Sequence, residues 1–314
     1  MTDKNTGAGT SAARGKDDGD WVAGVRISHP ERVLFKPEGI RKIDLARYYE
    51  AASERFLEHA QGRPVSLLRC PQGDIAHCFF QKHASDGFPE AIGQVPIRES
   101  DGGTENYMVI RDVEGLVAAV QVGTMEFHIW GSTAAELENP TRMVFDLDPD
   151  AGLDFADVRK AAVDLRGVLD AVGLKSLAMV TGGKGVHIVV PLDGRAEWST
   201  VKDFAKALAV RLADAAPDRY IATMSKAKRK DRIFIDWLRN ERGATAVAPY
   251  SVRARKGGPV AVPISWDELK TLKAANGFAI NEALERLGGP DPWREAGTWR
   301  QSVTKAMVEA VGAS

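Results

Sequence analysis

The sequence predicts an α+β fold in which a central antiparallel sheet packs against an N-terminal module of helix and strands. In the second half of the chain, segments follow in the order strand, helix, strand, strand, helix, strand. This split order is typical of ferredoxin-like and RNA-recognition-motif-like sheets, whose first and last strands are neighbours. In the first half, one amphipathic helix is followed by short strand-like segments.

The first half begins with a polar, glycine-containing stretch, residues 1–20, which predicts a disordered tail. Residues 42–60 place Leu45, Tyr49 and Phe56 near helical spacing and predict one amphipathic helix. Four short segments then read as strands because they are rich in aromatic and β-branched residues between turn residues: "PVSLLRC", "HCFFQKH", "NYMVI" and "FHIW".

The second half gives the split order its elements. "RMVFDLD", "SLAMVT", "GVHIVVPL" and "RIFIDWL" are the four predicted strands. A helix over 154–173 is expected to close at Gly173, and a helix over 199–216 is expected to begin at a Ser199 or Thr200 cap and to stop before Pro217. "TAVAPYSVRAR" is expected to add a strand, and the chain from Trp266 onward is expected to be helical with loops.

Composition excludes several classes of protein. The 314 residues are 44% hydrophobic and 27% charged, which fits a soluble globular chain, and the formal net charge of -1 gives no overall attraction for a polyanion. No apolar run is long enough for a membrane span. With only Cys70 and Cys78, a disulfide scaffold or cysteine-rich zinc site is not expected, and a reduced, cytoplasmic compartment is the simpler interpretation.

Two acids end the apolar strand "RMVFDLDPD". Asp146 and Asp148 point to one face because strand side chains alternate, and Asp236 interrupts the fourth strand, which neighbours the first in the predicted sheet. Three converging carboxylates repel one another unless a proton or divalent cation intervenes, and oxygen ligands suit such a cation. A turn that merely caps the next helix is the alternative interpretation of the Asp-x-Asp pair.

A glycine-rich loop lies between the second and third strands. It contains Thr181, Gly182, Gly183 and Lys184, whose backbone N-H groups and ammonium suit a phosphate, although the spacing is not that of a Walker loop. An ordinary hairpin turn is the alternative. His187 follows on the strand, either facing the same site or buried as a core histidine.

Positive charge is concentrated around the fourth strand, from Lys226 through Arg229 to Arg242, with Arg253 and Arg255 beyond. Such a run is either a solvated loop or a contact for triphosphate or nucleic-acid backbone. Phe79 and Phe80 are either core residues or a ring on which a base stacks.

These motifs together resemble one known family. "RVLFKPEGIRKIDLARYY", "FFQKH", "FDLDP", "TGGKGVHIVVPL", "KAKRKDRIFIDWLRN" and "ATAVAPYSVRAR" occur in the same order as in the polymerase domain of bacterial ATP-dependent DNA ligase D, in the archaeo-eukaryotic primase superfamily. The resemblance runs from about residue 24 to 295. It implies a primase-like fold and a single primase-polymerase catalytic domain over 21–300, with an N-terminal module (21–135), a catalytic module (136–260) and a helical segment (261–314).

The resemblance also implies roles for particular residues. Asp146, Asp148 and Asp236 resemble ligands for two divalent ions, usually Mn²⁺ and otherwise Mg²⁺. In this resemblance, His128 lies near the sugar of the incoming nucleoside triphosphate, and Phe80 or Phe79 stacks on its base. The full set of residues implied to contact the nucleotide is Thr181, Gly182, Gly183, Lys184, His187, Arg229, Arg253, His128, Phe80 and Phe79. Lys42 and Arg32 resemble the pocket for the 5'-phosphate across a gap, with Arg32 in a position where lysine also occurs.

The activity so implied is a template-directed nucleotidyltransferase that fills gaps and extends ends in bacterial non-homologous end joining. It would prefer ribonucleotides and work near the nucleoid with gapped or overhanging DNA, Ku and a DNA ligase. With 314 residues the chain has no room for a ligase or nuclease domain as well, so a stand-alone polymerase or one domain of a longer ligase is expected. The alternatives are a two-metal nuclease, which would use the same carboxylates on water, and a non-catalytic RNA-recognition-motif-like binding module.

Overall fold

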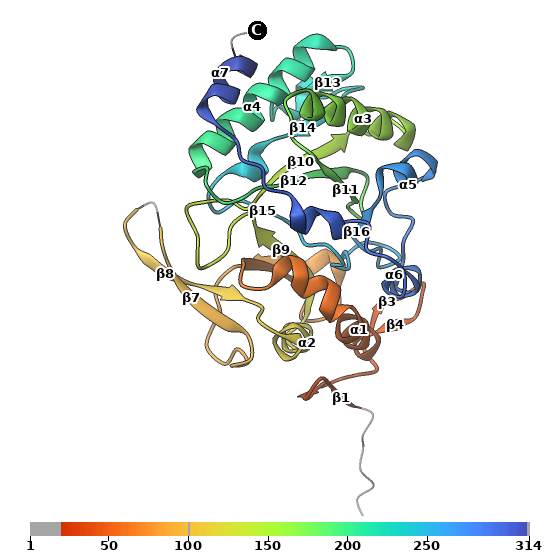
Figure 1. The fold of residues 1–314 in the computed structure, drawn as a ribbon. Helices are drawn as coiled ribbons and strands as arrows, with labels where there is room; N and C mark the ends of the chain where they lie inside the picture. The colour runs from red at the N-terminus through yellow and green to blue at the C-terminus, as the bar shows by residue number, and fades with distance from the viewer. Residues whose placement is uncertain (1–19, 100, 313–314) are drawn as a thin grey trace, which may run out of the picture.

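The computed structural model describes residues 20–99 and 101–312, so nearly all of the predicted tail over 1–20 lies outside the described residues. The described residues form four layers (Figure 1). Helices α3 (Phe155–Ala171) and α4 (Trp198–Ala215) lie over one face of a six-stranded sheet, and a second sheet lies beneath it. Helices α1 (Lys42–Ala60) and α2 (Val113–Gln121) cover the outer side of the second sheet.

The six-stranded sheet, called the aspartate sheet below, has the order β13-β14-β10-β12-β11-β16. In that order its strands are Tyr220–Ile221, Ile233–Asp236, Arg142–Pro149, Val186–Pro191, Leu177–Val180 and Val262–Ile264. The second sheet has the order β15-β9-β5-β8-β7, with β6 paired to β5. Its strands, with β6 last, are Thr245–Val247, Thr124–Trp130, Pro64–Arg69, Thr104–Val109, Gly93–Arg98 and Phe79–Gln81.

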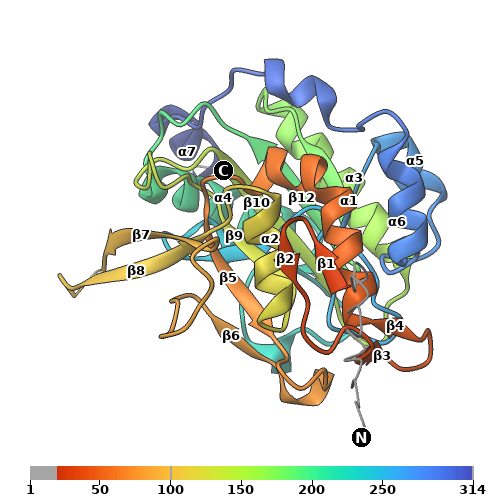
Figure 2. The ribbon, with the colours of Figure 1, turned by 90° about the horizontal axis from the view of Figure 1, so that it is seen from below.

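The remaining elements lie around these layers. The short strands are β1 (Trp21–Val22), β2 (Val25–Arg26), β3 (Val33–Phe35) and β4 (Ile40–Arg41). The other helices are η2 (Ile75–His77), η3 (Lys226–Lys228), η4 (Leu238–Asn240), α5 (Trp266–Thr271), α6 (Ile280–Leu287), η5 (Arg294–Thr298) and α7 (Lys305–Gly312). Seen from below, the β7–β8 hairpin extends beyond the body of the molecule (Figure 2).

The α+β class and the split strand order are confirmed. The four predicted strands form the centre of the aspartate sheet as β14-β10-β12-β11, so the first and last strands of the split order are neighbours. Strands β13 and β16 extend this sheet at its two edges, whereas "TAVAPYSVRAR" contributes β15 to the second sheet. The helices predicted over 42–60 and after Trp266 are present.

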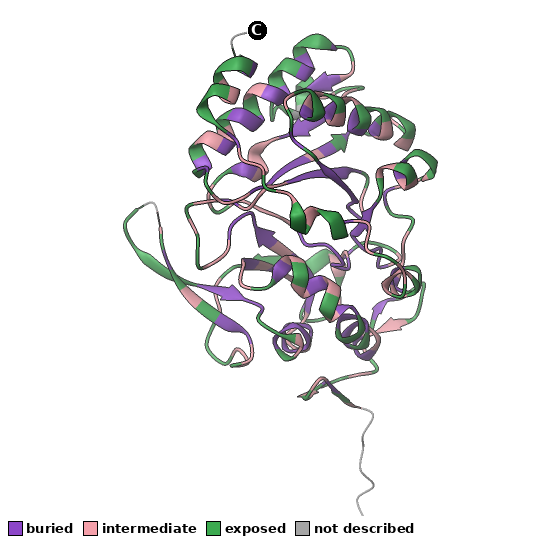
Figure 3. Cartoon of the chain, viewed as in Figure 1, coloured by how far each residue is buried: buried purple, intermediate pink, exposed green. Residues whose placement is uncertain are grey.

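Strand β10 has two faces with different surroundings. Met143, Phe145 and Leu147 are buried in the main hydrophobic core together with residues of α3 and α4. The alternate residues, from Val144 to Asp148, point toward the second sheet because strand side chains alternate. Figure 3 shows the consequence for the whole molecule, with buried residues along the strands and exposed residues on the outer sides of the helices.

Two local predictions were incomplete or wrong. Helix α4 begins at Trp198 with Glu197 at its N-cap, so the predicted Ser199 or Thr200 cap was wrong. The start moves because the Trp198 side chain is buried and its Nε1 donates a 2.7 Å hydrogen bond to Leu137 O. Helix α2 was not predicted, although Asp112 caps it by accepting from Gly115 N.

The two cysteines build no disulfide scaffold, as expected, but Cys70 and Cys78 form a single disulfide that the sequence did not predict. Strands β5 and β6 pair with Arg69 opposite Phe79. Because the pairing is antiparallel, Cys70, which follows Arg69, lies opposite Cys78, which precedes Phe79. Their Cα atoms lie 4.4 Å apart, within bonding reach. Two cysteines, although too few for a disulfide scaffold, therefore link the paired strands β5 and β6.

None of the helices in the described part of the chain is long and apolar enough to cross a membrane.

Candidate active site

The three predicted aspartates meet on the aspartate sheet. Strand β10 pairs with β14 so that Asp146 lies opposite Asp236, and Asp148 lies two residues farther along the same face of β10. On the other side, β10 pairs with β12 so that Asp146 lies opposite His187, with 3.6 Å between Asp146 Oδ2 and His187 Nε2. The carboxylates thus come from neighbouring central strands, as the split order predicts.

Arginines approach this group of carboxylates. Arg239 Nη2 lies 3.2 Å from Asp236 Oδ2 and 3.6 Å from Asp146 Oδ2, so one guanidinium group bridges both acids. Arg229 Nη1 lies 3.5 Å from Asp148 Oδ2. The sequence had assigned Arg229 to the triphosphate, and it had not assigned Arg239.

The carboxyl groups differ in their proton affinity. Burial raises the pKa of Asp148, and repulsion from Asp146 raises it further. Burial also raises the pKa of Asp236, because Arg239 offsets only part of that effect. Burial opposes ionisation of Asp146 too, but His187 and Arg239 outweigh it, so its pKa is lowered. Two acids with raised pKa values therefore lie beside an ionised third, and a divalent cation would neutralise the repulsion among the three carboxylates.

The donor set fits divalent cations in its chemistry. Oxygen ligands from adjacent strands are what Mn²⁺ and Mg²⁺ favour, and Arg239 already holds positive charge between two of them. The tightest grouping lies elsewhere: among the described residues, the one trio of potential ligands whose donor atoms all lie within 4.8 Å of one another is Glu58, His59 and Asp291. An ion on the aspartate sheet would therefore require the carboxylates to draw closer and Arg239 to move.

The glycine-rich loop connects β11 to β12 directly beside Asp146. Thr181 Oγ1 donates to Gly185 O at 2.9 Å and accepts from Gly183 N at 3.3 Å, which closes the turn. A Cβ on Gly185 would collide with the backbone carbonyl of Leu147, so only glycine lets the loop pack against the aspartate strand. Lys184 at the loop tip is exposed.

A buried carboxylate connects the two sheets. Glu126 on β9 is 3% exposed, and its Oε2 lies 2.8 Å from His128 Nε2 and 2.9 Å from Arg253 Nε. Arg253 Nη1 in turn donates to Thr181 O at 2.5 Å. Burial alone would raise the pKa of Glu126, but His128 and Arg253 lower it to about 2. Glu126 therefore fixes two predicted nucleotide contacts relative to the loop.

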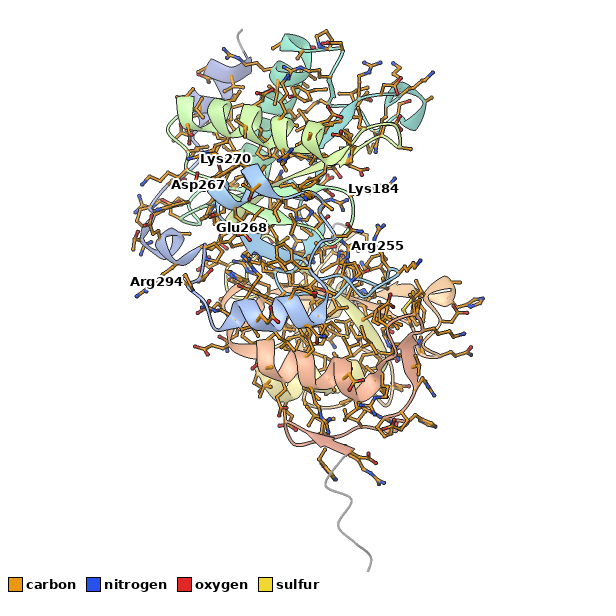
Figure 4. All side chains as sticks on the ribbon, turned by 90° about the vertical axis from the view of Figure 1, so that its right-hand side faces the viewer. Lys184, Arg255, Asp267, Glu268, Lys270 and Arg294 are labelled. Atoms are coloured by element: carbon orange, nitrogen blue, oxygen red, sulfur yellow. A yellow bond between two sulfur atoms is a disulfide. The ribbon has the colours of Figure 1, made fainter. Side chains whose placement is uncertain are left out.

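A cavity of 120 Å³ opens between these groups. Eight predicted site residues line it: His128, Asp146, Asp148, Thr181, Gly183, Lys184, His187 and Arg253. Arg239 and Arg255 line it as well, and in Figure 4 Lys184 and Arg255 lie on the same side of the molecule. Asp236 joins this group through its register with Asp146, and Gly182 lies in the loop itself.

Of the two predicted stacking rings, Phe80 contacts a residue that lines this cavity. Phe80 is 61% exposed, and its ring lies edge-on to His128 with 5.0 Å between centroids. Phe79 is also exposed, and its ring lies against the Arg69 guanidinium. Neither is a core residue, so the structural alternative for this pair is excluded. Phe80 is the ring next to the predicted sugar contact.

Lys42 and Arg32 lie together, but away from the aspartates. Lys42 is buried, and its Nζ donates to Ser28 O, Gln121 O and Gln121 Oε1 at 2.8 to 3.0 Å, which uses all three of its N-H groups. Burial, with a contribution from Arg32, lowers the pKa of Lys42 to about 8. Arg32 Nη1 donates to Pro71 O. A phosphate at Lys42 would have to replace one of these bonds.

Three site residues escaped sequence reasoning. Arg239 and Arg255 belong to the basic run that the sequence identified, but nothing in that run distinguished them from solvated neighbours. Glu126 stands in "MEFHIW", where its two-residue spacing from His128 was the available signal.

Comparison with known proteins decides the family. Residues 41–293 match the family model described as LigD, primase-polymerase domain. The chain belongs to the LigD primase-polymerase family. It is 41% identical over 294 residues to the multifunctional non-homologous end joining protein LigD of Pseudomonas aeruginosa, an alignment that covers 93% of this chain and 35% of that protein. LigD of Mycolicibacterium smegmatis is 31% identical over 265 residues, covering 84% of this chain and 34% of its own length.

A solved member of the LigD family confirms the fold. The polymerase domain from Mycobacterium tuberculosis ligase D in complex with DNA superimposes with a TM-score of 0.76 at 28% identity, covering 92% of this chain and 98% of that one. The primase-like fold that the sequence predicted is therefore confirmed. The chain spans about a third of the length of the curated relatives named above.

Proposed function

We propose that this chain is a template-directed nucleotidyltransferase that fills gaps and extends DNA ends in non-homologous end joining. The single observation that carries the proposal is the position of the glycine-rich loop, which places Lys184 and Thr181 in the same cavity as Asp146 and Asp148. A site that joins carboxylates to a phosphate-binding loop suits transfer of a nucleotide from a triphosphate. Membership of the LigD primase-polymerase family supports the same activity.

The proposed metal ligands are Asp146, Asp148 and Asp236, holding two divalent ions, with Mn²⁺ preferred to Mg²⁺. Such ions would lower the pKa of a primer 3'-hydroxyl and neutralise charge on the triphosphate oxygens. The raised pKa values of Asp148 and Asp236 support this assignment, since both acids sit in a place that disfavours a second and third negative charge.

The chain's own residues position the substrate. Lys184 and the backbone of Gly182 and Gly183 would bind the triphosphate of the incoming nucleotide, helped by Arg253 and Arg229. His128 would contact the sugar, held in one orientation by Glu126, and Phe80 would stack on the base. His187 would hold Asp146 ionised. Positioning and charge neutralisation would supply most of the rate.

DNA, Ku and a DNA ligase are the proposed partners, and ribonucleotides the preferred substrates. The formal net charge of -1 leaves DNA binding to local positive charge, which the exposed residues Lys184 and Arg255 supply at the cavity. The relative from M. tuberculosis was solved with DNA, which supports a DNA substrate here.

The test is primer extension on a gapped duplex with a 5'-phosphate, with Mn²⁺ and either ribonucleotides or deoxyribonucleotides. We expect template-dependent extension, faster with ribonucleotides. Shortening of the labelled primer without nucleotides would instead indicate the nuclease. DNA binding that needs no metal and gives no extension would indicate the non-catalytic module.

A second assay addresses the proposed 5'-phosphate pocket. Replacing Lys42 with Gln should weaken binding to a 5'-phosphorylated gap by about 1.5 to 3 kcal/mol, the typical value of a charged hydrogen bond. Binding to the unphosphorylated gap should change little, which separates lost phosphate contact from the lost internal bonds to Ser28 and Gln121. Equal losses on both duplexes would mean that Lys42 is structural.

A further inference from the structure

A large cavity lies on the other side of the molecule from the glycine-rich loop. It measures 720 Å³ and is formed by the end of α1, the first residue of β10 and the segment 289–297. Figure 4 shows Arg294, at its rim, and Lys184, at the candidate active site, on opposite sides. We call it the rear cavity. Its volume is in the range of small-molecule binding sites.

The rear cavity and the candidate active site lie at opposite ends of the region between the two sheets. Arg142 and Asp146 stand on the same face of β10, four residues apart. Between them, Val144, Val189 and Trp293 belong to an apolar cluster that fills the space between the two sheets. The rear cavity is therefore a separate compartment, closed off from the carboxylates by hydrophobic side chains.

The rear cavity carries an excess of positive charge. Four arginines line it, Arg55, Arg63, Arg142 and Arg294, against two acids, Glu58 and Asp291. Arg55 forms ion pairs with both acids, because its Nη1 lies 3.2 Å from Asp291 Oδ2 and 4.0 Å from Glu58 Oε2. Among these described residues, the other three arginines form no ion pair with these acids.

The two innermost guanidinium groups contact only neutral oxygens in the described structure. Arg63 donates to His59 O, Gly131 O and Thr141 Oγ1 at 2.7 to 3.0 Å. Arg142 donates one bond, to His59 O at 2.8 Å. Burial lowers the pKa of Arg142 to about 10, and no carboxylate opposes that shift.

Capping of helix α1 explains part of this arrangement but not all of it. Both guanidinium groups reach the carbonyl of His59 in the last turn of α1, where the helix dipole offers about half a negative charge. The two positive charges of Arg63 and Arg142 exceed this half charge. Arg142 is also left with N-H groups that have no partner among the described residues.

A cation is the wrong ligand for this place, although Glu58, His59 and Asp291 have the spacing of a metal site. Burial lowers the pKa of His59 to about 3, and Arg142, Arg63 and Arg55 lower it further by repulsion. The same arginines would repel a divalent ion, and Arg55 already holds Asp291. His59 Nε2 is buried and without a hydrogen-bond partner, so the cavity also offers a neutral polar atom.

We propose that the rear cavity is a second ligand site, for a small phosphorylated molecule with a flat or apolar body. The excess of two arginines over acids matches the charge of a phosphomonoester, about -1.5 to -2 at neutral pH. The unpaired N-H groups of Arg142 meet the phosphate, since a guanidinium group binds phosphate through two parallel bonds. Trp293, Val189 and Leu177 face the body of the molecule.

The test measures binding of phenyl phosphate by titration calorimetry without divalent ions, so it does not depend on polymerase activity. We expect saturable binding that Arg142→Gln weakens by about ten- to a hundredfold, the loss of a charged hydrogen bond. Arg294→Gln, at the exposed rim, should weaken it less and serves if Arg142→Gln fails to fold. Lys184→Gln, at the active site, should leave it unchanged.

Two further probes define the ligand chemistry. Inorganic phosphate should bind more weakly than phenyl phosphate because it lacks the body that packs on Trp293, and benzoate should bind more weakly because it carries one charge. Absence of saturable binding, or binding that Lys184→Gln abolishes and Arg142→Gln leaves intact, would overturn the proposal. Tighter binding of benzoate would overturn the assignment to phosphate.

Discussion

Asp146 stands at the centre of the candidate site, between Asp236 on one neighbouring strand and His187 on the other. If it holds a metal, replacing it with Asn should reduce metal-dependent extension by at least about a hundredfold, as loss of a major electrostatic contact does. The side chain is nearly the same size, and the lost attraction to His187 and Arg239 is offset by relief of the repulsion that Asp146 exerts on Asp148 and Asp236, so the unfolding temperature should stay close to that of the wild type.

Asp214→Asn is the matched control for Asp146→Asn, because Asp214 lies exposed on α4. It should leave extension unchanged. Extension that survives in Asp146→Asn would contradict the metal assignment.

Glu126 makes a pH-dependent contribution to stability. Its pKa is lowered from 4.5 to about 2 in the folded protein, where burial opposes ionisation and His128 and Arg253 outweigh it. This contribution to the free energy of unfolding is about 3 kcal/mol. It is complete at pH values above the pKa of Glu126 in the unfolded chain, and it is lost as the pH falls through the pKa of Glu126 in the folded protein. Glu126→Gln should therefore be less stable at pH 7 and should lose less stability between pH 5 and about 2.

Urea unfolding of the wild type and Glu126→Gln across that pH range measures this difference. Parallel stability curves for the two proteins would show that Glu126 is not the group responsible.

At the scale of elements, the loop from Thr181 to Gly185 depends on close packing against β10. A Cβ at Gly185 would meet the carbonyl of Leu147, next to the aspartates. Gly185→Ala should destabilise the protein by about 1 to 3 kcal/mol, the usual cost of overpacking, and lower extension as β10 shifts.

Gly167→Ala is the matched control, since Gly167 lies inside α3 with open space around it. It should stabilise by about 0.5 to 1 kcal/mol because alanine favours a helix. Thermal unfolding of both variants measures these changes. A Gly185→Ala protein as stable and active as the wild type would contradict the packing argument.

Sequence reasoning succeeded where a feature depends on local periodicity. The alternation in "RMVFDLD" placed Asp146 and Asp148 on one face, and the split order placed Asp236 beside them. It failed where a feature depends on contacts distant in the sequence. Glu126 acts through Arg253, 127 residues away, and helix α4 starts early because of a bond from Trp198 to Leu137.

At the scale of the whole molecule, one hydrophobic core extends through both sheets. It includes Leu45 of α1, Val65 of β5, Phe145 of β10 and Phe204 of α4. Because these elements share one core, the modules predicted over 21–135 and 136–260 should unfold together. Urea unfolding followed by tryptophan fluorescence and by far-ultraviolet circular dichroism should give coincident transitions. Two separated transitions would divide the chain into independent domains.

The pairing of Asp146 with Asp236 limits how relatives of this chain can vary in length. Residues 222–225, between β13 and η3, are mostly exposed outside the sheet and can gain or lose residues without moving either acid. One residue inserted within β14 would instead turn Asp236 toward α3 and α4, into the apolar layer. Natural insertions should therefore collect in the connection, and the spacing from Ile233 to Asp236 should stay constant.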